Sequence, residues 1–153
     1  MIIQSTRFGE LDIVETDIIN FPYGIPGFPD EKSFVSVVND PDSPFSFLQS
    51  TQEAYLTFLV ADPFTFFKDY EFVLDDEVDQ ELGISEEQPP QVFVIATVKE
   101  KMEDMTVNLL APIVINSQKS IGRQIVLEKS VYGTRHQLFP NGLPQQQAVQ
   151  GGR

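Results

Sequence analysis

The sequence predicts an all-β fold: a small antiparallel β-barrel-like domain of about nine or ten short strands, with one short acidic helix and one helical turn. Short segments that are either apolar or alternate between apolar and polar residues follow one another through the chain. Turn-forming Gly, Pro, Asn and Asp separate them at intervals of about 8–12 residues. Only one stretch has a clear helical period. Successive short strands divided by turns are typical of barrels and sandwiches.

The most apolar run, residues 106–116, lies at the centre of this prediction. Pro112 interrupts it, and proline cannot donate to a strand ladder. We therefore expect two strand pieces, 107–110 and 113–116, with a bend between them. The bend is either a corner in a folded-over sheet or an unpaired edge that a partner can use. The second interpretation makes this region a candidate binding edge, with Asn108, Leu110, Pro112 and Asn116 as its residues.

The other segments with strand character are short and rich in β-branched and aromatic residues. They span residues 1–4, 8–14, 18–21, 34–38, 45–50, 56–60, 70–74, 92–98 and 121–127. The spacing of the last one suits a hairpin with residues 113–116. Weaker apolar positions follow at Tyr132, Leu138 and Phe139, which we expect to pack onto the body.

The helical turn is expected after Asp62, because Asp before Pro63 is typical of a helix start. The phenylalanines that follow are expected to pack into the core; they are Phe64, Phe66 and Phe67.

Residues 75–82, DDEVDQEL, carry the strongest helix signal. Asp75 is placed at the N-cap, acidic residues fill the first turn, and Gly83 follows as a stop. Leu74, Val78 and Leu82 share one face, and the other face is acidic. A calcium loop is disfavoured because Gln80 stands where the sharp turn requires glycine. The acidic face is either a solvated surface or a binding surface, whose candidate residues are Asp75, Asp76, Glu77 and Asp79.

Residues 21–34, FPYGIPGFPDEKSF, form a loop with three prolines and two glycines between positions 22 and 29. Fixed proline φ angles can make such a loop stiff. Its aromatic residues favour either a structural cap over a barrel end or a rigid recognition surface. Tyr23 and Phe28 are the candidates for recognition.

The net charge is −13, from 23 acidic and 10 basic residues. Such a chain repels phosphate backbones, so we expect no direct nucleic-acid partner. No signal peptide or membrane span is evident, which favours a cytoplasmic protein. We expect one domain over residues 1–139, a disordered tail over residues 140–153, and a monomer.

No residue constellation for catalysis is present in the sequence. There is no cysteine, His136 is the one histidine, and no nucleophile elbow or phosphate-binding loop occurs. We therefore expect no enzyme activity, metal or cofactor.

Five segments, in order and without large gaps, resemble the FliW family of flagellar assembly factors. They are IIQSTRFGEL, the loop FPYGIPGFPDEKSF, SPFSFLQS, LTFLVADPFTFFKDYEF and NLLAPIVIN, within a likeness that runs from about residue 2 to about residue 138. The resemblance implies a small, cytoplasmic, non-enzymatic β-barrel-like protein. It also implies two partners: flagellin, and CsrA, a dimeric RNA-binding repressor of flagellin mRNA translation. Free FliW binds CsrA and prevents repression, by a mode that the resemblance favours as non-competitive.

The charge fits that implication, because an RNA-binding repressor presents basic surface to phosphates and an acidic protein is suited to meet it. Two other functions remain open. A dedicated cytoplasmic chaperone of flagellin would bind flagellin but not CsrA. A small-molecule-binding β-barrel would need an internal cavity lined by some of the 13 phenylalanines.

Overall fold

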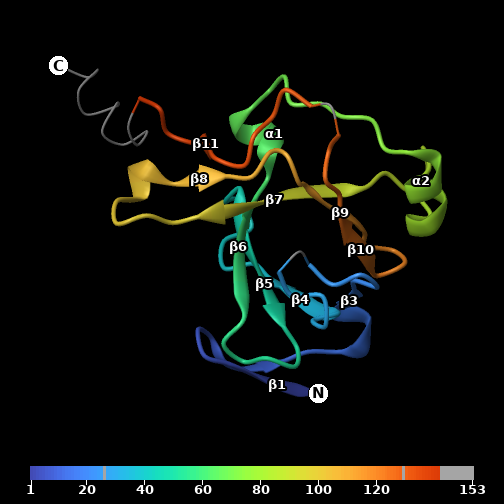
Figure 1. Ribbon diagram of the computed structural model, residues 1–153. Coiled ribbons are helices and arrows are strands. Elements are labelled where there is room, and N and C mark those ends of the chain that lie inside the picture. The colour runs from blue at the N-terminus through green and yellow to red at the C-terminus, as the bar shows by residue number, and fades with distance from the viewer. Residues whose placement is uncertain (26, 129, 142–153) are drawn as a thin grey trace.

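The computed structural model describes residues 1–25, 27–128 and 130–141 (Figure 1). They form two α-helices, α1 (Pro63–Phe66) and α2 (Asp76–Leu82), and two 3₁₀ helices, η1 (Glu15–Asp17) and η2 (Met102–Asp104). The strands of the described residues are β1 (Ile2–Ser5), β2 (Gly9–Asp12), β3 (Ile18–Asn20), β4 (Ser33–Val37), β5 (Phe45–Ser50), β6 (Thr57–Ala61), β7 (Gln91–Thr97), β8 (Thr106–Val107), β9 (Ile113–Asn116), β10 (Ile121–Gln124) and β11 (His136–Gln137). The all-β class, with one short acidic helix and one helical turn, is confirmed.

Seven strands close into a barrel in the order β7-β6-β5-β4-β3-β10-β9, and β9 pairs back onto β7. The pairings are antiparallel except that of β10 with β3, where Ile121 lies beside Asn20. β7 serves two neighbours along one edge: residues 91–93 pair with β9 and residues 96–97 pair with β8. β8 and β11 therefore extend from the barrel wall (Figure 1).

Large apolar side chains fill the barrel. Phe21 and Phe34 are 0% exposed and their rings meet edge to face, with centroids 5.5 Å apart. The other buried members of this cluster are Ile19, Ile25, Leu48, Leu56, Val60, Ile113 and Ile115. Each such side chain stabilises the fold by about 1.5–3 kcal/mol when fully buried. These side chains form a packed cluster inside the barrel.

A second core lies where β7 and β8 meet α1 and the C-terminal segment. Tyr70 is buried there and its hydroxyl donates a hydrogen bond to the Leu109 carbonyl at 2.7 Å. Tyr132, Leu138 and Phe139 pack into this cluster, as the sequence predicts. The segment after residue 130 is thereby held against the barrel wall.

The β1–β2 hairpin forms a separate two-stranded sheet beside the barrel. Gln49 of β5 joins the two: it is 0% exposed, and its Oε1 accepts hydrogen bonds from Ser5 Oγ and Thr57 Oγ1. Its Nε2 donates to three backbone carbonyls, of Ser50, Glu53 and Ala54. A buried amide whose hydrogen-bonding groups are all engaged positions the hairpin specifically.

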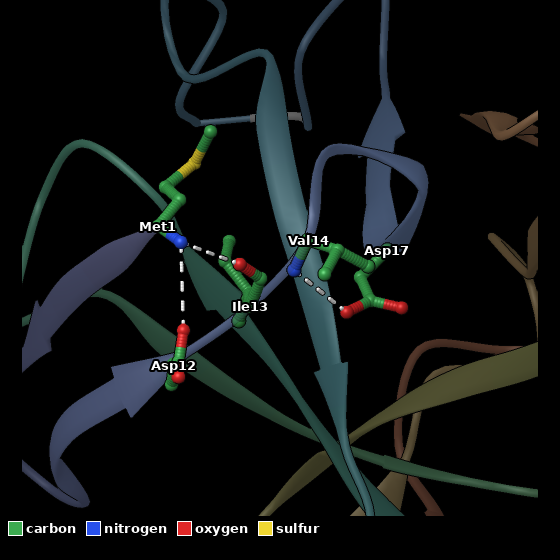
Figure 2. Close-up of polar contacts among 5 residues, drawn as sticks. All are labelled: Met1, Asp12, Ile13, Val14 and Asp17. Carbon is green, nitrogen blue, oxygen red and sulfur yellow. Dashed lines mark hydrogen bonds and ion pairs between the residues drawn. The ribbon is translucent and has the colours of Figure 1, made fainter.

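The chain begins in a fixed position (Figure 2). The Met1 ammonium donates to the Ile13 carbonyl at 3.0 Å and lies 3.4 Å from Asp12 Oδ1. One residue on, the Val14 N–H donates to the Asp17 carboxylate at 3.1 Å. These contacts join the first residue to the turn between β2 and β3.

Residues 70–74 are not the strand that the sequence predicts. Their burial alternates, with Tyr70 buried, Phe72 and Leu74 half-buried, and the residues between them exposed. Yet they pair with no strand among the described residues. The barrel strands beside this segment, β7 and β9, have no free edge. β7 has β6 on one edge and β8 and β9 on the other, and β9 lies between β7 and β10.

Three more predictions need correction. The strand over residues 107–110 is short, because Asn108 Oδ1 accepts from the N–H groups of Leu110 and Ala111 and turns the chain. Strand β10 likewise stops at residue 124 rather than 127. Phe64 does not enter the core, since it is 44% exposed at the first turn of α1, whereas Phe66 and Phe67 do pack.

The two-residue strand β11 went unpredicted because it is too short to show a pattern. Of the expected tail, residues 142–153 lie outside the described residues, and Pro140 and Asn141 follow the packed residues Leu138 and Phe139.

Candidate partner-binding surface

Helix α2 presents a carboxylate face to solvent. Val78 and Leu82 are buried against Val114 of β9, which fixes the opposite face outward. On that side Asp75, Asp76 and Glu77 are exposed and Asp79 is half-buried. Asp75 stands at the N-cap with extended backbone, but its side chain makes no capping hydrogen bond. None of these four carboxylates forms an ion pair within the described residues, so their charge is uncompensated by direct contacts.

Arg123 of β10 links α2 to the proline-rich loop. Its Nη1 lies 2.8 Å from Glu81 Oε2, and its guanidinium stacks over the Tyr23 ring at 4.5 Å. Tyr23 is 60% exposed, so its ring remains accessible beside the acidic helix. Arg123 therefore connects Tyr23 to Glu81 of α2, although the two residues are far apart in sequence.

Phe28 has a different environment from Tyr23. It is 36% exposed and its ring packs edge-on against Phe58, with centroids 5.7 Å apart. Phe21 and Ile25 of the same loop are fully buried in the barrel core. Most of the loop's apolar surface thus caps the barrel, which matches the structural interpretation of its aromatic residues.

The region around Pro112 does not present a free strand edge. Pro112 is buried and its carbonyl accepts from the Ile125 N–H at 2.9 Å. Leu110 donates to the Gly133 carbonyl at 3.1 Å and accepts from the Leu127 N–H at 2.8 Å. The bend is therefore a corner within hydrogen-bonded backbone.

Asn116 is 2% exposed and connects β9 to the end of α2. Its Nδ2 donates to the carbonyls of Leu82 and Gly83 at 2.8 and 3.2 Å and to Gln88 Oε1 at 3.1 Å. Its Oδ1 accepts from the N–H groups of Gln118 and Lys119. The side chain holds the acidic helix in place and is not itself accessible.

The structure adds a surface that the sequence did not single out: residues 71–75, which we call the strap, and the groove beside it. This strap groove has a volume of about 770 Å³ and runs between the strap and residues 123–128 and 130–132. Three valines on it are strongly exposed: Val73 (92%), Val126 (57%) and Val131 (93%). In the sequence, residues 70–74 have a strand pattern. Nothing in that segment indicates that it would stay unpaired.

The described residues hold no group of three or more His, Cys, Asp or Glu side chains arranged to bind a metal ion. His136 has a structural contact, because its Nε2 accepts the Gly133 N–H at 2.7 Å. Burial, with a smaller contribution from nearby Tyr132, raises the pKa of Tyr70 far above its ordinary range, so this phenol stays protonated. In the described part of the chain no helix has the length and apolar character needed to cross a membrane.

Comparison of the sequence with known proteins identifies a matching family. The family model described as FliW protein matches residues 2–138. The flagellar assembly factor FliW of Desulfitobacterium hafniense (strain DSM 10664 / DCB-2) is 61% identical over 145 residues, covering 95% of each chain. That of Heliobacterium modesticaldum (strain ATCC 51547 / Ice1) is 46% identical over 140 residues, covering 92% of each.

The fold agrees with the sequence comparison. A crystal structure of the flagellar assembly factor FliW superposes with a TM-score of 0.86 at 41% identity, covering 94% of this chain and 100% of that one. The chain therefore belongs to the FliW family, a family of flagellar assembly factors rather than of catalysts.

Proposed function

We propose that this chain is a non-enzymatic regulator of flagellum assembly that binds flagellin and, when free of flagellin, binds the translational repressor CsrA. Binding of CsrA relieves repression of flagellin mRNA translation. The observation that carries the proposal is the FliW family match over residues 2–138, together with the partners that the family resemblance implies. The protein acts in the cytoplasm as a monomer, without a cofactor and without contacting nucleic acid itself.

The charge distribution supports this proposal. CsrA must present a basic surface to RNA phosphates, and this chain carries a net charge of −13. The uncompensated carboxylates of α2, namely Asp75, Asp76, Glu77 and Asp79, form the charge complement, and Tyr23 is joined to the same helix through Arg123 and Glu81. Complementary fields of this kind accelerate encounter and disfavour wrong partners.

The remaining candidate residues take secondary places in this proposal. Phe28 and Leu110 are partly accessible and can widen the contact. The other three candidates contribute through structure. Asn108 forms a turn, Pro112 lies at the corner, and Asn116 anchors the helix.

Titration calorimetry against purified CsrA tests the proposal, at low salt and at roughly 0.5 M salt, with flagellin as competitor. We expect saturable binding that weakens with salt and is displaced by flagellin. The double variant Asp76→Lys/Glu77→Lys should weaken CsrA binding strongly. The matched control Glu100→Lys/Asp104→Lys changes the total charge equally at the η2 end of β7, where both residues are exposed, and should weaken it far less.

Two other results would change the assignment. Binding of flagellin without any binding of CsrA would leave a dedicated flagellin chaperone. Equal losses in the two charge variants would show that only the total charge matters and would remove α2 from the contact.

A further inference from the structure

The strap has the features of a strand without a partner. Its side chains alternate between half-buried Phe72 and Leu74 and exposed Glu71, Val73 and Asp75, which is the period of a half-buried strand. Within the described residues, none of the backbone N–H groups from Phe72 to Asp75 donates a hydrogen bond. Strand-like sequence, alternating burial and unused donors coincide in this segment.

The alternation of an extended chain directs the free N–H of Val73 toward the strap groove. The Glu71 N–H donates to Tyr132 Oη at 3.1 Å, and Tyr132 lies on the opposite wall. In extended chain, backbone groups two residues apart point to the same side. The Val73 N–H therefore faces the same wall as that of Glu71, but it finds no acceptor there among the described residues.

The opposite wall, over residues 125–127, also has an unused backbone donor. The N–H groups of Ile125 and Leu127 donate to Pro112 and Leu110, away from the groove. The alternation then turns the backbone of Val126 toward the groove, and its N–H has no acceptor in the described part of the chain. Gln124 on this wall holds the one buried side-chain oxygen of the described residues that lacks a hydrogen-bond partner.

The rim of the groove is acidic. Glu71, Asp75 and Glu128 line it, and its one cation in the described residues, Arg123, is already engaged by Glu81 and Tyr23. An occupant with basic residues is therefore favoured over an acidic one.

We infer that the strap groove accepts an extended, basic segment of a partner protein as an added strand, hydrogen-bonded to Val73 on one side and to Val126 on the other. Alternate apolar side chains of that segment face the groove, and the lysines or arginines between them meet the rim carboxylates. Strand addition obtains its affinity from main-chain hydrogen bonds and its selectivity from the alternate side chains. The inference rests on the proposed function, since it names the form in which a protein partner is held.

The substitution Val73→Pro tests the inference because it removes one N–H and keeps the backbone extended. The free protein loses no contact, since the Val73 side chain is 92% exposed and its N–H has no partner. Val98→Pro is the matched control: Val98 is 51% exposed, follows β7, and its N–H also has no acceptor in the described residues. Urea unfolding should confirm that both variants remain folded.

We expect Val73→Pro to weaken binding of flagellin or CsrA at least about tenfold, because a partner carbonyl would be left without its donor, and Val98→Pro to leave both unchanged. Wild-type affinity of Val73→Pro for both partners would overturn strand addition while leaving the proposed function intact.

A second measurement is independent of those partners. The acetylated and amidated heptapeptide Lys-Val-Lys-Val-Lys-Val-Lys, titrated to about 1 mM, should shift the amide resonances of Val73 and Val126 and slow their hydrogen exchange. The same peptide with N-methylated valines, and a Glu-Val version, should do neither. Unchanged Val73 and Val126 amides with the first peptide, or equal changes with all three, would overturn the inference even if neither protein partner binds.

Discussion

Replacement of Asn116 by alanine separates two roles for a residue that the sequence marked as a candidate contact. In the structure its side chain makes five hydrogen bonds from a position that is 2% exposed. Three of them join the end of α2 and the segment after it to β9. A structural role predicts a loss of stability, whereas a direct contact role predicts a loss of binding alone.

The expected loss of stability depends on which hydrogen-bonding groups water can reach after the substitution. Gln118 and Lys119 are exposed and Gln88 is partly exposed, so their polar groups can regain water. The carbonyls of Leu82 and Gly83, at the helix end, lose the donor that replaced their missing intrahelical partners. Each buried polar group left unpaired costs about 1–3 kcal/mol, so Asn116→Ala should lower the free energy of unfolding by about 3 kcal/mol.

Urea unfolding with an unchanged m-value measures this difference, and the melting temperature should fall by roughly 6–12 °C. Asn20→Ala is the control, because Asn20 is exposed and its amide makes one 3.5 Å bond to the Ser120 carbonyl. That variant should lose under about 0.5 kcal/mol. A loss below about 1 kcal/mol for Asn116→Ala would refute the assignment of Asn116 as the anchor of α2.

Two further predictions concern the same structure. Gly83 ends α2 with φ of +68°, so Gly83→Ala should destabilise the protein by about 1 kcal/mol in urea unfolding, and Gly83→Asn should lose less; equal losses would contradict the left-handed cap. The raised pKa of Tyr70 means that the unfolded chain releases this phenolic proton first. Stability should therefore be independent of this group below about pH 10 and fall above it, and Tyr70→Phe should reduce that alkaline slope; an unchanged slope would show that Tyr70 ionises as readily in the fold.

The sequence predicts which segments have strand character better than it predicts which of those segments pair. Residues 45–50, which alternate, and residues 113–116, which belong to a continuous apolar run, carry strand patterns and are strands. Residues 70–74 carry an equally good pattern but stay unpaired, because both edges of the strands that they pack on, β7 and β9, are already paired. The apolar pattern of one segment predicts which of its side chains are buried, whereas strand pairing also depends on a second segment.

The sequence likewise predicts part of the candidate partner-binding surface and misses another part. The amphipathic pattern of residues 75–82 was enough to place the acidic face of α2 outward, and the structure confirms it. The pattern could not show that Arg123 would neutralise Glu81 yet leave Asp76 and Glu77 free. That selection depends on β10 packing beside the helix, a contact between segments about 40 residues apart.

The proximity of acidic helix and groove has a consequence for how a bound partner would be held. Asp75 belongs to the groove rim and is also the N-cap of α2, so a basic segment lying in the groove also lies in the field of the helix carboxylates. Exposed charges are screened over about 8–10 Å at physiological salt, whereas backbone hydrogen bonds in a groove are not. Salt should therefore act mainly on the association rate, and the Val73 N–H mainly on the dissociation rate. A single docking surface would in this way combine a fast, charge-dependent encounter with a slow release set by main-chain geometry.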